Sequence, residues 1–292
     1  IEFCISNEKK KLNVLTHKLD DAEYILIHLH GLHSCFQFTL DCPDEFYNRV
    51  SILKKGKVVS YALEFNGHGK SEGRKGYLNN FDTLIDDLDC LVNYVSNYHN
   101  NLPIYLLGES LGGSVAVKYC HLNKNKIKGI ILLAPLLGLK DLPSNNFINF
   151  LINCSYMFPS LNLKYFLTRK NQNENIEYKN YLRKNIYNFT DKLTLCSVRE
   201  CYLFCKWWED NIKEFNTPSL FFHSKKDMTT DYEYTKKLYE LSSKPCNEFI
   251  SYNNSSHNLL VPKNTNDINP FIILHKITNW IRSDKDWDEI KL

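Results

Sequence analysis

A serine flanked by glycines is the strongest chemical signal in the sequence. Residues 108–113 read Gly-Glu-Ser-Leu-Gly-Gly and fit G-x-S-x-G, the nucleophile elbow, in which a strand turns sharply into a helix with the serine at its apex. Small residues two positions before and after the serine prevent backbone clashes in such a turn. An apolar run over 104–107 precedes the motif and a helical run over 114–119 follows it. We therefore predict Ser110 as a nucleophile.

A nucleophilic serine needs a base, and hydrolases with this elbow carry their acid and then their histidine later in the chain. The candidate bases after Ser110 are His121, His223, His257 and His275. His257 lies in a polar loop that follows a strand, which is where a base that reaches the substrate is expected. His223 lies inside an apolar strand and is interpreted as a buried histidine, whereas the other two lie in helices. We predict His257 as the base.

The acid should follow the strand that comes before the base. Asp227 comes soon after the apolar run 219–223, and Asp231 is its rival four residues later. Either aspartate could cap the helix expected over 232–241, since aspartate is favoured at that position. Asp231 fits the cap better and Asp227 lies closer to the strand end. We therefore predict that Asp227 orients the ring of His257 and stabilises its charged form.

A tetrahedral intermediate needs two backbone N–H donors for its oxyanion. The amide of Leu111, directly after the nucleophile, is one candidate. The other is the amide of Leu32, which follows His30-Gly31 at the end of the apolar run 24–29. A His-Gly pair is a weak signal and gains value from the strand before it. This chemistry needs no metal and no organic cofactor.

The elements that must position these residues alternate along the chain. Continuous apolar runs of the kind that form strands buried on both faces occur at 24–29, 58–63, 104–107, 130–133 and 219–223. Helical spacing is expected over 81–99, after Ser110, over 232–241 and over 272–282, with a further strand near 248–252 and an opening hairpin of strands at 1–6 and 12–17. This alternation predicts an α/β fold with a mostly parallel, doubly wound sheet.

Residues 136–216 break this alternation. They read as several short helices without a clear strand, so we expect a helical insertion between core segments 1–135 and 217–292. Large apolar side chains recur there near helical spacing: Phe147, Phe150, Leu151, Tyr156, Met157, Phe158, Tyr202, Phe204, Trp207 and Trp208. We expect most of them to pack the insertion onto the core.

Composition excludes several classes of protein. The formal net charge is +3 over 292 residues, which argues against a nucleic-acid-binding protein. The ten cysteines lack the spacing of metal ligands and are expected to be free thiols in a reducing compartment. The longest apolar run, 127–139, is interrupted by Lys128 and Pro135 and is too short for a membrane span. Without a recognisable signal peptide, the expected location is cytoplasmic.

Three segments resemble those of monoacylglycerol lipases and lysophospholipases of the α/β-hydrolase superfamily. They are 67–73 (Gly-His-Gly-Lys-Ser-Glu-Gly), 108–113 and 252–260. The resemblance covers nearly the whole chain, is weakest over the insertion, and in its Asn- and Lys-rich loops is similar to a parasite branch of lysophospholipase-like proteins. It implies a triad of Ser110, Asp227 and His257, an oxyanion hole of Leu32 and Leu111, and a cap over 136–216. The chain departs from the family at Ser224, where a glycine is usual.

The resulting expectation is a serine ester hydrolase that acts on lipid esters such as lysophospholipids or monoacylglycerols. An apolar cap would favour acyl chains and would make transient contact with membranes or micelles, which places the protein at membrane surfaces part of the time. The first alternative is another enzyme on the same scaffold, above all a carboxylesterase for small or short-chain esters. The second is a non-catalytic binding protein with this fold.

Overall fold

The protein is built on one eight-stranded sheet with the order β1-β2-β4-β3-β5-β6-β7-β8. The computed structural model describes residues 1–7, 10–36, 43–139, 144–162, 175–176, 180, 184, 187, 193–264 and 266–284, with the backbone alone at residue 7 and over 43–48. The strands are β1 (Glu2–Asn7), β2 (Lys10–Thr16), β3 (Tyr24–Leu29), β4 (Val58–Leu63), β5 (Ile104–Glu109), β6 (Gly129–Leu133), β7 (Ser219–Ser224) and β8 (Glu248–Tyr252).

Most of this sheet is parallel, as predicted. β1 pairs with β2 in the expected antiparallel hairpin, and β2 pairs antiparallel with β4. The five remaining pairings, from β4 through β3, β5, β6 and β7 to β8, are all parallel. The carboxyl ends of these strands therefore meet at one edge, which is where sites form in open α/β sheets.

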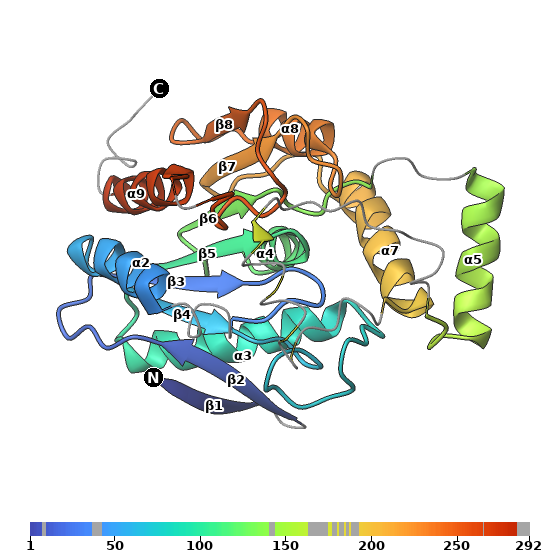
Figure 1. Cartoon of the computed structure of the whole chain (residues 1–292), viewed down its shortest axis with the longest axis horizontal. Helices are drawn as coiled ribbons and strands as arrows, with labels where there is room; N and C mark the ends of the chain where they lie inside the picture. Colours follow the sequence, from blue (N-terminus) through green and yellow to red (C-terminus); the bar gives the residue numbers. More distant parts are fainter. Residues whose placement is uncertain are drawn as a thin grey trace.

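Helices cover both faces of the sheet (Figure 1). One face packs against α2 (Pro43–Lys55) and α9 (Asn269–Arg282), and the other packs against α3 (Asp82–Tyr98), α4 (Leu111–Leu122) and α8 (Tyr232–Glu240). Helix α2 was not predicted from the sequence. It supplies the crossover that the parallel pairing of β3 and β4 requires.

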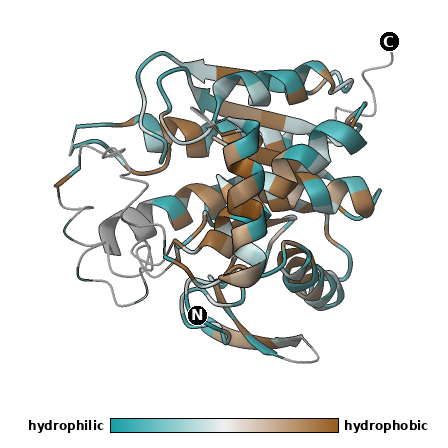
Figure 2. Ribbon diagram, turned by 90° about the vertical axis from the view of Figure 1, so that its right-hand side faces the viewer, coloured by the Kyte–Doolittle hydropathy of each residue, from teal (hydrophilic) through white to brown (hydrophobic). Residues whose placement is uncertain are grey.

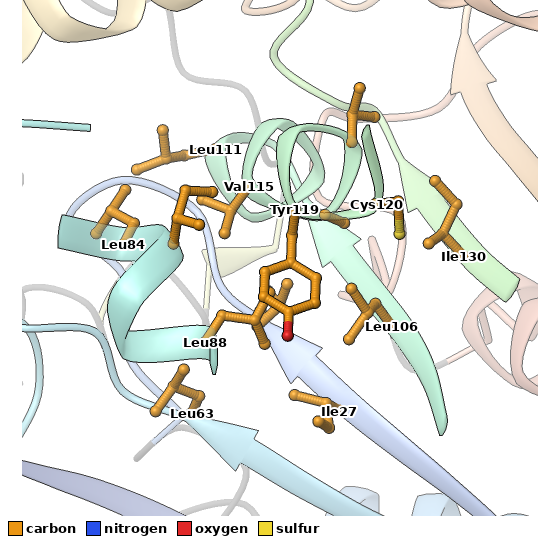
Figure 3. Close-up of a cluster of buried hydrophobic side chains, with 14 of the residues drawn as sticks. Ile27, Leu63, Leu84, Leu88, Leu106, Leu111, Val115, Tyr119, Cys120 and Ile130 are labelled. Carbon is orange, nitrogen blue, oxygen red and sulfur yellow. The ribbon is translucent and has the colours of Figure 1, made fainter. Parts of the chain in front are cut away.

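The core beneath α4 holds the elbow helix against the sheet. Figure 3 shows Leu111, Val115 and Tyr119 of α4 above Ile27 and Leu106 of the neighbouring strands. All five side chains are fully buried, so small shifts of α4 would create cavities or clashes. In Figure 2 apolar colour gathers in the interior and polar colour lies toward the outside.

The insertion contains two helices within the part of the chain that is described, α5 (Asn145–Met157) and α7 (Leu195–Asn211). α7 packs on the core: Trp208 is fully buried and its indole N–H donates to the Leu137 carbonyl at 2.6 Å. α5 packs against α7 and lies on the outer side of the molecule (Figure 1).

The expectation that most apolar side chains of the insertion pack onto the core is wrong for α5. Half or more of the surface of five of the ten is exposed: Phe147, Phe150, Tyr156, Met157 and Phe158. Only Ile148 and Ser155 of this helix are buried, and within the described part of the chain α5 packs mainly against α7. An apolar surface of this size on a helix is unusual unless something covers it.

Two further expectations concern cysteines and membranes. The nine cysteines that the structure describes are all free thiols, as predicted. Among the described residues, no helix is both long enough and apolar enough to span a bilayer.

Candidate active site

Ser110 occupies the turn between β5 and α4 with φ 51° and ψ −114°. A positive φ is strained for a residue with a side chain. The glycines of the motif make the turn possible. A Cβ on Gly112 would lie 2.1 Å from the Leu29 carbonyl oxygen, and a Cβ on Gly108 would lie 2.5 Å from the Gly112 carbonyl oxygen. Strand and helix therefore approach more closely here than any side chain allows.

The backbone of Ser110 is held by the segment that follows β6. Its N–H donates to the Leu133 carbonyl at 3.1 Å, and its carbonyl accepts from the Leu136 N–H at 2.9 Å. These bonds hold the strained conformation in place. The turn presents the serine at the amino end of α4, where free amides favour a developing negative charge.

Asp227 and His257 come together at the carboxyl ends of the neighbouring strands β7 and β8. The Nδ1 of His257 lies 2.7 Å from the Oδ2 of Asp227. The other carboxylate oxygen accepts the N–H groups of Thr229, at 2.7 Å, and Thr230, at 3.3 Å. Asp227 is only 1% exposed. The carboxylate therefore has a defined orientation, with one oxygen turned toward the imidazole.

The surroundings of Asp227 keep it ionised. Burial alone would raise its pKa, but the charge of His257, hydrogen bonds from His223 and His257, and the Thr229 N–H hold the pKa well below its usual value. A carboxylate that stays negative is what stabilises an imidazolium during catalysis.

The rival acid Asp231 has a different place. It is the N-cap of α8, and its side chain accepts the N–H of Glu233 at 2.9 Å. Ser224, the departure from the family pattern, also has a place: its Oγ accepts the N–H of Ser255 at 3.0 Å. This bond ties the loop of His257 to the end of β7.

The contact between His223 and Asp227 was not predicted from the sequence. His223 is fully buried, as expected, but its Nε2 lies 3.3 Å from the same Asp227 oxygen that His257 contacts. The available signal was its position four residues before the candidate acid. The remaining histidines lie elsewhere: His121 packs against Trp207, and His275 is exposed on α9.

The loop after β3 approaches the nucleophile closely. A Cβ on Gly31 would lie 3.3 Å from the Cβ of Ser110. The amides of Leu32 and Leu111, the predicted oxyanion donors, have no hydrogen-bond partner among the residues that the structure describes. No described group therefore occupies either amide.

His30 orients one of these amides. The N–H of Phe65 can only donate, so the Nε2 of His30, 3.2 Å away, accepts, and the proton lies on Nδ1. Nδ1 then donates to the Gly31 carbonyl at 2.8 Å. In a trans peptide the N–H points opposite to the carbonyl, so this bond fixes the direction of the Leu32 N–H. Burial lowers the pKa of His30 to about 3, which keeps the ring neutral.

Ser110 and His257 are not hydrogen-bonded to each other in the part of the chain that is described. Burial raises the pKa of the Glu109 carboxyl, and the charges of Arg49 and His257 oppose that rise. Bonds between nucleophile and base are often long until a substrate is present.

A cavity of about 110 Å³ lies beside the elbow, with both polar and apolar walls. Gly31 and Glu109 border it, and the Nε2 atoms of His17 and His28 in its walls have no partner among the described residues. It offers space for small polar groups beside Gly31 and Glu109. Over the same described part, no three His, Cys, Asp or Glu side chains are grouped to hold a metal ion.

The parallel sheet, the strained serine elbow and the buried Asp227–His257 pair define an α/β-hydrolase. The sequence model of the family described as serine aminopeptidase, S33, matches residues 22–264. The chain therefore belongs to this family of α/β-hydrolases.

Curated relatives include monoglyceride lipase of Rattus norvegicus, 31% identical over 88 residues, or 30% of this chain and 29% of that protein. Phospholipase YtpA of Bacillus subtilis is 36% identical over 130 residues, or 43% of this chain and 45% of that protein. The matches thus span less than half the length of these relatives. Among solved structures, a soluble variant of monoglyceride lipase from Saccharomyces cerevisiae with a substrate analog has a TM-score of 0.80 at 15% identity, over 97% of this chain and 94% of that one.

Proposed function

We propose that the protein is a serine ester hydrolase that acts on lipid esters of the monoacylglycerol or lysophospholipid class. The observation that carries the proposal is the buried Asp227–His257 pair, joined at 2.7 Å, which follows strands β7 and β8 at the same edge of the parallel sheet as the strained elbow of Ser110 after β5. Ester-hydrolysing enzymes among the relatives support this reaction class.

In this mechanism His257 removes the proton of Ser110 as its Oγ attacks the ester carbonyl. Asp227 holds Nδ1 of His257, so that Nε2 is the nitrogen that takes the proton. The amides of Leu32 and Leu111 stabilise the oxyanion. His257 then protonates the leaving alcohol, and water attacks the acyl-enzyme by the same route to release the acid.

The insertion 136–216 is proposed to be a cap that selects acyl chains. Its apolar side chains are the support for a lipid substrate. The relatives named monoglyceride lipase and phospholipase also support a lipid substrate.

The test is a substrate panel for the wild-type protein, together with labelling by a fluorophosphonate probe. We expect labelling, and nitrophenyl ester turnover that rises from acetate to longer acyl chains. Monoacylglycerol and lysophosphatidylcholine should also be cleaved, whereas an amino-acid nitroanilide should not. Turnover of short esters alone would favour the carboxylesterase alternative. Absence of both labelling and turnover would leave a binding protein as the better interpretation.

We further propose that α5 is the part of the cap that contacts lipid surfaces. Its thirteen residues, NNFINFLINCSYM, include no charged side chain. Phe147, Phe150 and Met157 are each at least half exposed. An uncharged helix with large apolar side chains lowers its free energy by placing them in a lipid interface.

Replacing Phe147, Phe150 and Met157 together with serine should reduce binding to phosphatidylcholine vesicles about a hundredfold, since each of the three apolar side chains contributes on the order of 1 kcal/mol when buried. Hydrolysis of micellar substrates should fall in parallel, while kcat/KM for a soluble short ester should not change. The matched control is Ile268→Ser with Ile272→Ser, which removes exposed apolar side chains outside the cap. Vesicle co-sedimentation equal to wild type in the triple variant would refute the role of α5.

A further inference from the structure

One oxygen of the Asp227 carboxylate lies between two histidines. Oδ2 is 2.7 Å from Nδ1 of His257 and 3.3 Å from Nε2 of His223. His223 belongs to β7 and is fully buried, so water does not compete for its ring. The hydroxyl of Thr230 is 3.1 Å from the same oxygen and 3.1 Å from the Ala134 carbonyl.

The tautomer of His223 follows from its two partners. An ionised carboxylate only accepts, so Nε2 of His223 carries the proton toward Asp227. Nδ1 then has a lone pair, and the hydroxyl of Thr235, 2.8 Å away on α8, donates to it. Thr235 is also fully buried. Both ring nitrogens thus have a partner, and α8 holds the ring as a donor aimed at the carboxylate.

We propose that His223 is a positioning residue for hydrolysis: it fixes the Asp227 carboxylate and shares the oxygen that orients His257. The inference rests on the proposed roles of Asp227 and His257. An oxygen that accepts two imidazole N–H groups gives each a weaker bond than it would give one alone. His223 therefore limits how strongly Asp227 stabilises the protonated form of His257, in addition to holding the carboxylate in place.

The three residues His223, Asp227 and His257 form a hydrogen-bonded array. The other charged or titratable groups around this array are identical in all variants of His223. The Tyr232 ring of α8 is 5.7 Å from His223, and Lys225 and Lys226 are exposed in the loop before Asp227. On the side of β5, the base is influenced by Glu109, which has Arg49 of α2 nearby. A shift in pH dependence between variants thus reports the lost His223 bond.

The test compares His223→Leu, His223→Gln and Thr235→Val by the pH profile of kcat/KM on a soluble ester. In His223→Leu we expect the plateau to fall about tenfold, because the carboxylate loses a donor worth roughly 1.5 kcal/mol. Its acid limb should move to higher pH by about half a unit, because the full charge of Asp227 then favours protonated His257. KM should change little. His223→Gln should recover most of the wild-type plateau and of the wild-type position of the acid limb, since its amide N–H can replace Nε2–H.

Thr235→Val should move both quantities in the same direction by a smaller amount, because it releases the ring without removing it. The control is His121→Leu, which replaces a histidine that packs against Trp207; its plateau and acid limb should match those of wild type. An independent readout is the low-field proton resonance of His257 Nδ1–H, which should shift in His223→Leu. This measurement needs no substrate and does not depend on activity.

A wild-type plateau and acid limb in His223→Leu would overturn the proposal. Equal losses in His223→Leu and His223→Gln with an unmoved acid limb would also overturn it, since that pattern indicates packing alone. If thermal unfolding shows that His223→Leu does not fold, an unmoved profile in Thr235→Val, which is predicted to shift, counts against the proposal. Failure of the proposed function looks different: wild type neither labels nor hydrolyses, while the His257 resonance still reports whether His223 acts on the array.

Discussion

Ester hydrolysis by Ser110→Ala should be at least about a thousandfold slower than by wild type, because the acyl-enzyme cannot form without the Oγ nucleophile. Fluorophosphonate labelling should vanish in the same variant. Alanine retains the Cβ, so the strained elbow, the buried α4 and the bonds to Leu133 and Leu136 remain. The measurement is single-turnover and steady-state hydrolysis of a long-chain nitrophenyl ester.

Ser243→Ala is a suitable control for this change. Ser243 is exposed and its hydroxyl contacts Asn216 on the surface, so activity should stay within about twofold of wild type, as for most surface substitutions. Full labelling of Ser110→Ala at another site would show that the probe reports a different nucleophile, and undiminished turnover would refute the role of Ser110.

Asp227→Asn should lower kcat by up to about 10⁴-fold at neutral pH, because an amide presents either a donor or a neutral acceptor to His257 and loses the charge that stabilises the imidazolium. The loss should appear in kcat more than in KM, since the bond matters most when His257 is protonated. Separate measurement of kcat and KM on the soluble ester over a pH series tests this prediction.

Asp231→Asn separates catalysis from helix capping. Asparagine caps a helix about as well as aspartate, so the bond to the Glu233 N–H can persist and both activity and the unfolding temperature should be close to wild type. If instead Asp231→Asn were the inactive variant and Asp227→Asn the active one, the assignment of the acid would be wrong.

The fold was predictable where the signal is local or periodic. Strands buried on both faces are continuous apolar runs, so the parallel sheet could be read from 24–29, 58–63 and 219–223. The elbow was predictable because its backbone conformation needs glycines at fixed spacing around Ser110, which is a demand on adjacent residues. α2 was missed because nothing in the run after Leu32 required a helix until β3 and β4 were known to pair in parallel.

The sequence by itself determined a serine elbow, an α/β sheet and a short set of acid and base candidates. The sequence favoured Asp227 over Asp231 as the acid, but only the tertiary structure shows the carboxylate of Asp227 against His257 and that of Asp231 on the Glu233 N–H. The tertiary structure also decided that His223 serves the same carboxylate and that α5 leaves its apolar side chains exposed. The physical reason is the same in each case: a hydrogen bond or a buried surface needs two partners, and the second partner comes from a distant part of the chain.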